Sequence, residues 1–189
     1  MVTREAIVAS ARGWLGTPYH HQASCKGVGC DCLGLIRGIW RELYGPEPET
    51  MPPYTRDWGN ATGSETLLQA ACRHLAKLAD VSAAEPGDVL VFRMRDEGVA
   101  KHAGILTTSP SYRRLPARSR SFASAKAGKP VSRITGSVLA ALDSGLRRND
   151  ACVRDRLIHS QEGLGVVEIE LGPWWRRRAV AAFRFPDVG

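Results

Sequence analysis

The chain has 189 residues, of which 43% are hydrophobic and 24% charged, a composition typical of one globular domain with a sizeable core. No stretch approaches the roughly 18 consecutive apolar residues of a membrane-spanning helix, so we expect no membrane span. The net charge of +7 comes from residues 109–156, which hold 11 Lys or Arg and 3 Asp or Glu, while the remaining residues carry a net charge of −1. Because the basic character belongs to that segment, we predict no specific nucleic-acid partner.

The five cysteines are few and odd in number, which argues against a disulfide scaffold. Cys25, Cys30 and Cys32 follow His20 and His21, which raises the alternative of a zinc site. Their spacing lacks the paired pattern of zinc ligands, and no second cluster follows, so we expect no metal and no cofactor. The N-terminus has no apolar signal-peptide core, and we therefore expect the chain to be made in the cytoplasm.

Apolar residues at helical spacing predict three helices in the first half of the chain, over residues 3–14, 32–44 and 64–79. Thr3 and Ser64 are possible N-caps of the first and third helices. Residues 46–58 contain four prolines, which exclude regular structure between the second and third helices.

Short apolar runs predict five strands in the remainder, at residues 89–92, 102–107, 157–160, 166–171 and 179–185. Helices followed by strands with short turns indicate an α+β protein, with the N-terminal helices packed on a central antiparallel sheet. Segment 109–156 is longer than the turn that two neighbouring strands need. We predict a single domain, residues 1–189, with a flexible basic insertion at about 109–156. Contact of this segment with nucleic acid or another anionic polymer is the alternative.

Cys32 stands at the start of the second predicted helix, directly after Asp31. The first N–H groups of a helix have no partner within the helix, and the helix dipole is positive there. Both effects favour a thiolate, so Cys32 is a candidate nucleophile near neutral pH, and Asp31 is a candidate helix cap. The alternative is a buried structural cysteine, because free cysteines are among the most buried residues.

A thiol nucleophile needs a base that takes its proton, and the base needs an orienting partner. Of the five histidines, His102 begins a predicted strand directly after a polar turn, where its side chain can enter a cleft from a rigid base. His159 lies within an apolar strand and is either an orienting group or a core residue. His74 falls inside the third predicted helix, and we expect it to face solvent.

Several stretches in a fixed order resemble the motifs of one family: Trp14 to Tyr19, Cys30 to Leu35, Pro86 to Leu90, His102 to Ile105, Ile158-His159, Leu171 to Arg178 and Phe183 to Pro186. The chain resembles the NlpC-type cell-wall endopeptidases, which are papain-like cysteine peptidases. Within that family it is most similar to the subgroup carried by tail gene clusters of phages and gene transfer agents. The resemblance covers nearly the whole chain except about 109–156.

The resemblance implies a role for each of five residues. Cys32 would attack the scissile carbonyl, His102 would act as general base and then acid, and His159 would hold the His102 ring in its productive tautomer. Tyr19 matches the family tyrosine whose hydroxyl reaches the cleft near the nucleophile, with ordinary packing beneath the loop as the alternative. Asp31 belongs to the nucleophile motif. Backbone N–H groups at the start of the helix would stabilise the oxyanion.

The implied function is hydrolysis of peptidoglycan stem peptides, typically between D-glutamate and a diamino acid such as diaminopimelate. The protein would act at the cell wall as part of a phage tail or tail-like particle, with tail proteins as partners. One alternative is a structural tail-tip protein with the same fold and impaired catalysis. Another is a papain-like amidase or acyltransferase on a different substrate. Trp174, Trp175 and the three arginines that follow are a candidate docking patch.

Three features depart from the family pattern. Leu33 stands where many relatives have serine, and His20-His21-Gln22 replaces a glycine-rich turn. Between His102 and His159 lie 56 residues, where relatives have a short hairpin. The expected contact between the two histidines therefore depends on how the inserted residues are accommodated.

Overall fold

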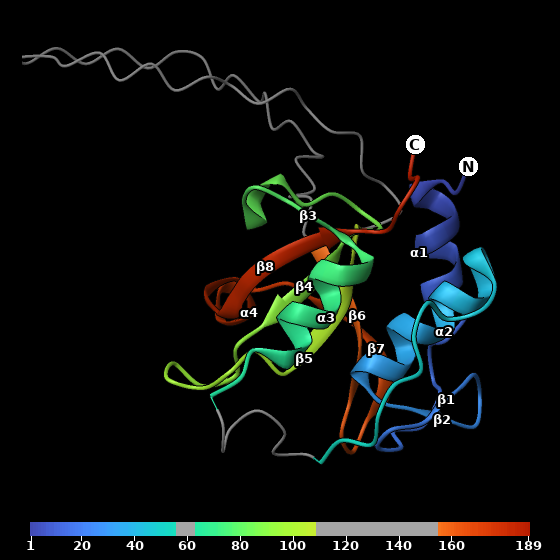
Figure 1. Ribbon diagram of the computed structural model, residues 1–189, viewed down its shortest axis with the longest axis horizontal. Coiled ribbons are helices and arrows are strands. Elements are labelled where there is room, and N and C mark those ends of the chain that lie inside the picture. The colour runs from blue at the N-terminus through green and yellow to red at the C-terminus, as the bar shows by residue number, and fades with distance from the viewer. Residues whose placement is uncertain (56–62, 109–154) are drawn as a thin grey trace, which may run out of the picture. The chain divides into compact units, whose positions relative to one another are not determined.

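A computed structural model describes residues 1–55, 63–108 and 155–189, which belong to one compact unit (Figure 1). The two termini lie side by side, with Val2 paired to Val188. The helices among the described residues are α1 (Arg4–Arg12), α2 (Cys32–Tyr44), α3 (Thr66–His74), the 3-10 helix η1 (Val81–Ala83) and α4 (Pro173–Arg178). The strands are β1 (Ser24–Cys25), β2 (Gly29–Cys30), β3 (Ala76–Lys77), β4 (Val89–Phe92), β5 (His102–Thr108), β6 (Asp155–Gln161), β7 (Gly165–Glu170) and β8 (Ala179–Arg184).

An antiparallel sheet with the strand order β3-β8-β4-β5-β6-β7 forms the centre of this unit. All four residues of β4 are buried, as suits a short apolar strand that is covered on both faces. The predicted α+β class and central antiparallel sheet are confirmed. The described sheet has six strands rather than about five, because β3 pairs with β8 at one edge.

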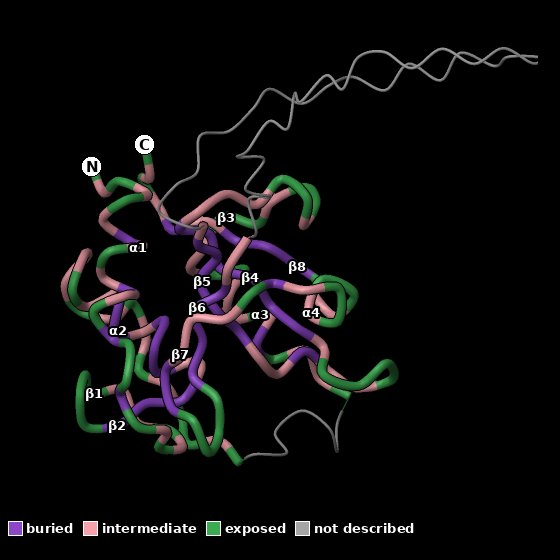
Figure 2. Tube along the Cα trace, turned by 180° about the vertical axis from the view of Figure 1, so that it is seen from behind, coloured by how far each residue is buried: buried purple, intermediate pink, exposed green. Residues whose placement is uncertain are grey.

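Different elements cover the two faces of the sheet. We call the side that carries α1, α2 and α3 the helix face, and the opposite side the α4 face. The helix face buries side chains that include Ile7, Leu35, Ile39, Leu67, Val91 and Ile105. The α4 face buries a smaller set that includes Leu90, Phe92, Leu106 and Leu157, with Trp175 packed against it. Figure 2 shows the buried strands in purple between more exposed helices and turns.

The third helix is shorter than the prediction of 64–79. α3 ends at His74 because Leu75 is extended and the next two residues pair with β8. Glu65, not Ser64, occupies the N-cap position, and its side chain makes no capping hydrogen bond. In the first helix Thr3 is the N-cap, as predicted, and accepts a hydrogen bond from the backbone N–H of Ala6 at 3.2 Å.

Helix α4 was not predicted. Its six residues begin with Pro173, which suits the first turn of a helix because proline has no N–H to donate. A helix of this length is too short for the 3.6-residue periodicity on which the sequence prediction relied. α4 matters for the site because it brings an aromatic side chain onto the sheet.

Strands β5 and β6 pair in register up to Thr108 and Asp155, the last described residues on either side of 109–154. Asp155 and Arg156, at the end of the insertion predicted at about 109–156, therefore belong to a strand. The rest of the predicted insertion lies outside the described residues, and the single-domain organisation stays a prediction.

Replacing residues 109–154 with a short turn that contains glycine is expected to leave a folded protein with an equal or higher free energy of unfolding. Two antiparallel strands can be joined by a turn of a few residues, and each halving of a loop lowers its closure cost by about 0.6 kcal/mol. Thermal and urea unfolding followed by circular dichroism measure the change. A fall in the melting temperature of more than about 10 °C would show that the replaced residues stabilise the sheet.

Candidate active site

Cys32 is the first residue of α2, and Asp31 is its N-cap, as predicted. The Asp31 carboxylate accepts a hydrogen bond from the backbone N–H of Gly34 at 2.8 Å. Gly34 is required here, because a Cβ on this residue would lie 1.9 Å from the backbone oxygen of Ala23. The loop before α2 therefore lies directly against the first turn, which holds Cys32 in place.

The buried carboxylate of Asp31 also organises two other segments. It accepts a hydrogen bond from the backbone N–H of Gln22 at 2.7 Å and another from the hydroxyl of Tyr54 at 2.6 Å. The imidazole of His21 lies 3.7 Å away. Sequence reasoning missed Tyr54, because a tyrosine in a proline-rich connection carries no motif and its partner is distant in sequence.

A backbone bridge between Tyr19 and Cys30 brings the loop that begins at Tyr19 alongside the residues just before the nucleophile. The N–H of Cys30 donates to the carbonyl of Pro18 at 3.0 Å. On the other side, the hydroxyl of Ser160 donates to the carbonyl of Cys30 at 2.8 Å. Tyr19 is half-buried, and the position of its hydroxyl in a cleft stays a prediction.

The two predicted catalytic histidines meet at the ends of neighbouring strands. His102 is the first residue of β5 and His159 lies near the end of β6, and His102 Nε2 is 2.8 Å from His159 Nδ1. The rings are perpendicular, with centroids 4.9 Å apart. The 56 residues between them in sequence do not prevent this contact, because the antiparallel pairing of β5 with β6 sets their distance.

Gly104 allows β6 to approach β5 beside these histidines. A Cβ on Gly104 would lie 2.8 Å from the carbonyl oxygen of Ile158 and 2.8 Å from the side chain of Leu157. Any other residue would therefore force the two strands apart next to His159. Close packing of β5 against β6 thus explains why the His102 to Ile105 motif contains a glycine.

The Cys32 sulfur lies against the backbone at the start of β5. The thiol donates to the carbonyl oxygen of Lys101 at 3.8 Å, and the N–H of Ala103 donates to the sulfur. These two residues flank His102 in sequence, so the thiol and the His102–His159 pair lie at the same end of β5. Within the described residues, no hydrogen bond joins the Cys32 sulfur to either imidazole. Catalytic hydrogen bonds are often absent or long until substrate binds.

Burial controls the protonation states of all three groups. Burial, followed by the charge of Asp31, raises the pKa of Cys32 to about 12, although backbone N–H groups of the helix start favour the thiolate. Burial, together with the charge of the neighbouring imidazole, lowers the pKa of His102 to about 3, and burial lowers the pKa of His159 to about 4. The resting site therefore holds a neutral thiol and two neutral imidazoles, not the thiolate expected from the helix terminus alone.

Aromatic side chains cover the histidine pair on the α4 face. The ring of Trp175 lies 4.9 Å from that of His159 and 5.6 Å from that of His102, between centroids. Phe92 lies 5.1 Å from Trp175 and 6.0 Å from His102. The half-buried Trp175 is thus turned toward the site, whereas Trp174 is 43% exposed. Only Trp174 and the arginines remain available for the docking patch predicted from sequence.

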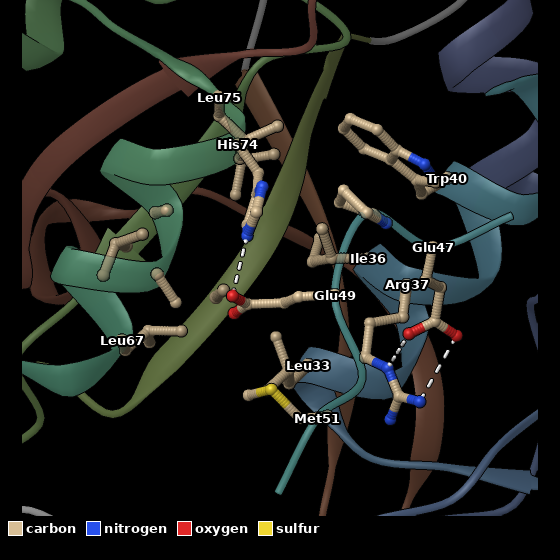
Figure 3. Close-up of a pocket in the computed structure, with 16 residues that line it drawn as sticks. Leu33, Ile36, Arg37, Trp40, Glu47, Glu49, Met51, Leu67, His74 and Leu75 are labelled. Carbon is tan, nitrogen blue, oxygen red and sulfur yellow. Dashed lines mark hydrogen bonds and ion pairs between the residues drawn. The ribbon is translucent and has the colours of Figure 1, made fainter.

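A cavity of about 90 Å³ lies on the helix face between α2, α3 and β4–β5 (Figure 3). It reaches Leu33 and Ala103, the residues that follow Cys32 and His102. Its wall is apolar except for two polar pairs: the ion pair of Arg37 with Glu47 at 2.6 Å, and His74 Nε2 with the Glu49 carboxylate at 3.1 Å. His74 is therefore a half-buried, paired residue of the cavity wall, and the prediction that it faces solvent is wrong.

Cys25, Cys30, Cys32 and Cys72 are free thiols. Within residues 1–55, 63–108 and 155–189, no cluster of three or more His, Cys, Asp or Glu side chains is arranged to hold a metal ion. None of the helices in the same residues is long and apolar enough to cross a membrane.

Comparison with solved structures identifies the fold. The NlpC/p60 domain of the peptidoglycan hydrolase SagA matches with a TM-score of 0.50 and 20% sequence identity, over 97% of this chain and 100% of that chain. A Staphylococcus aureus protein described as similar to a lipoprotein of the NLP/P60 family matches with a TM-score of 0.46 and 14% identity, over 96% of this chain and 41% of the other. No family model and no curated protein matches the chain. The first likeness shows the NlpC/p60 fold, as the motif resemblance predicted.

Replacing Asp31 with Asn is expected to speed alkylation of Cys32, because the Asp31 charge raises the pKa of the thiol. The protein should also lose about 1–2 kcal/mol of stability, since the N–H of Gln22 loses a charged acceptor. Iodoacetamide labelling at pH 8 with mass-spectrometric quantification measures the rate, and the exposed Cys72 in the same molecule is the internal reference.

Tyr54→Phe is the matched control, because it removes one hydrogen bond to Asp31 and leaves the charge in place. Equal rates for D31N and the parent protein, or equal acceleration by Y54F, would contradict the electrostatic effect of Asp31 on Cys32.

Acid should destabilise the protein through the imidazoles of His102 and His159. Both have a pKa well below the ordinary value of 6.5, so between about pH 6.5 and 4 the unfolded chain binds protons that the folded chain excludes. The free energy of unfolding therefore keeps its full value above pH 6.5 and decreases as the pH falls from about 6.5 to 4. Urea unfolding at several pH values should show a shallower fall for His159→Gln than for the parent, and parallel curves would contradict the lowered pKa values.

Proposed function

We propose that this chain is a cysteine peptidase that hydrolyses peptidoglycan stem peptides, with Cys32 as nucleophile, His102 as general base and His159 as its orienting partner. The 2.8 Å hydrogen bond between His102 and His159, at the strand end where the Cys32 thiol is also bound, is the observation that carries this proposal. The fold likeness to a domain of SagA, a peptidoglycan hydrolase, supports the substrate class.

The protonation states favour proton transfer during attack over a preformed thiolate–imidazolium pair. As the substrate carbonyl reaches Cys32, the S–H proton moves to His102 Nδ1 while the sulfur–carbon bond forms. In the productive tautomers, His102 Nε2–H donates across the 2.8 Å contact to His159 Nδ1, which fixes the ring and spreads the positive charge. Backbone N–H groups at the start of α2 stabilise the oxyanion.

Collapse of the tetrahedral intermediate breaks the amide bond, and His102 returns its proton to the leaving amine. Water then attacks the thioester, with neutral His102 as base, and releases the carboxylic acid and the thiol. Because the pKa of His102 is low, this base is available down to acidic pH.

We propose cleavage between D-glutamate and a diamino acid, with Tyr19 beside the nucleophile, during cell-wall penetration by a phage tail or tail-like particle. The motif resemblance at Leu171 to Arg178 and Phe183 to Pro186 supports the tail setting. These stretches correspond to α4 and the end of β8.

A non-catalytic structural protein with the same fold is the second candidate. Two observations favour it: the Cys32 sulfur has no hydrogen bond to an imidazole within the described residues, and burial raises the pKa of the thiol to about 12. This candidate predicts a folded protein that releases no peptide.

Turnover of purified peptidoglycan and of a γ-D-glutamyl-diaminopimelate peptide tests the proposal. Cys32→Ala should abolish release, with a loss of at least about 10³-fold, and His102→Ala should lower it by about 10²–10⁴-fold. The matched control is Cys72→Ala, which removes an exposed thiol on α3 and should leave turnover unchanged. Equal release by the parent and C32A would refute the nucleophile, and no release by the parent would favour the structural candidate.

A further inference from the structure

The histidine pair has one polar atom that the mechanism leaves unpartnered. His159 is fully buried, with a relative exposure of 0%, and its Nε2 atom has no hydrogen-bond partner among the described residues. Buried polar groups without a partner are rare in folded proteins because they have lost their bonds to water. The surroundings of this nitrogen therefore need an explanation.

Two arrangements of protons satisfy the hydrogen bond between the neutral rings. In the first, His102 Nε2–H donates to His159 Nδ1, so His102 Nδ1 is bare and His159 Nε2 carries a proton. In the second, His159 Nδ1–H donates to His102 Nε2, so His102 Nδ1 carries a proton and His159 Nε2 is bare. Only the first leaves His102 Nδ1 able to accept the thiol proton. The productive arrangement therefore requires an N–H at the unpartnered atom.

Apart from His102, the aromatic ring that contacts His159 among the described residues is that of Trp175. The two centroids are 4.9 Å apart and the ring planes meet at 69°, an arrangement in which the edge of one ring faces the other. An aromatic face carries partial negative charge and accepts weak N–H hydrogen bonds. The face offers no donor to a bare nitrogen, because the single N–H of an indole lies in the plane of its ring.

We propose that Trp175 is a positioning residue whose indole face accepts the Nε2–H of His159 and so holds the pair in the arrangement with a bare His102 Nδ1. Its catalytic consequence rests on the proposed function, whereas its effect on the tautomers does not. Trp175 also lies 5.6 Å from His102, with the planes at 36°, so its face can stabilise the imidazolium that forms during attack.

The test is ¹⁵N NMR of histidine-labelled protein at pH 7, which distinguishes Nδ1–H from Nε2–H imidazoles. In the parent, both His102 and His159 should be Nε2–H tautomers. Trp175→Leu, which removes the aromatic face, should convert at least half of His102 to the Nδ1–H tautomer, while Trp175→Phe should retain most of the parent arrangement. Trp174→Leu is the matched control, because it changes the exposed neighbour in α4 and should leave both tautomers unchanged.

Global incorporation of fluorinated tryptophan provides a second variant that keeps the ring size and weakens the negative face. It should shift the His102 tautomer in the same direction as W175L by a smaller amount, even where W175L fails to fold. An Nδ1–H tautomer of His102 in the parent, or unchanged tautomers in both W175L and the fluorinated protein, would overturn the proposal.

Kinetics of peptide hydrolysis test the effect of Trp175 on catalysis. W175L should lower kcat about 10-fold with little change in KM, since the substrate still binds but fewer molecules hold a competent base. A parent protein with the expected tautomers and no turnover would refute the proposed function and leave the role of Trp175 intact. Unchanged kcat in a W175L protein that has lost the productive tautomer would refute the catalytic consequence alone.

Discussion

The site depends on the hydrogen bonds that the buried carboxylate of Asp31 accepts. This carboxylate caps α2 at the backbone of Gly34, binds the N–H of Gln22 and accepts the hydroxyl of Tyr54. Three segments are thereby joined at the residue before the nucleophile. A carboxylate serves this purpose well because it can accept several hydrogen bonds at once, and charge-assisted bonds are the stronger ones. Burial is the main reason that the neighbouring thiol stays protonated, and the charge of Asp31 adds to this effect, so the group that positions Cys32 also disfavours its ionisation.

The second constraint is the pairing of β5 with β6. Backbone hydrogen bonds set the distance between His102 and His159, and Gly104 removes the side chain that would separate the strands. Ser160 then ties β6 to the carbonyl of Cys30, two residues before the nucleophile. The sheet thus contacts the chain at Cys30 through Ser160 and at Cys32 through the carbonyl of Lys101. This geometry explains how two imidazoles from strands separated by a long segment meet at one strand end.

Burial determines the electrostatics of these groups. A thiol at a helix N-terminus is stabilised as thiolate by nearby N–H groups, but loss of water and the Asp31 charge act in the opposite direction and are larger here. The imidazoles are held neutral by the same loss of water, with Trp175 and Phe92 packed around them. Neutral partners suit a mechanism in which the proton moves only when substrate is present.

Local sequence determined much of the chain: the cap and start of α2 at Asp31 and Cys32, the strand at 89–92, the strand that begins at His102 and the α+β class. Each follows from interactions within a few residues, such as side-chain capping and apolar periodicity. The hydrogen bond between His102 and His159, the contact of Tyr54 with Asp31, the addition of β3 to the sheet and the position of Trp175 were decided only by the tertiary structure. These contacts join residues far apart in sequence, so they depend on strand register and packing. The protonation state of Cys32 was also decided by the tertiary structure. Local sequence places the thiol at a helix terminus, but the exclusion of water from the thiol depends on all the residues that pack around it.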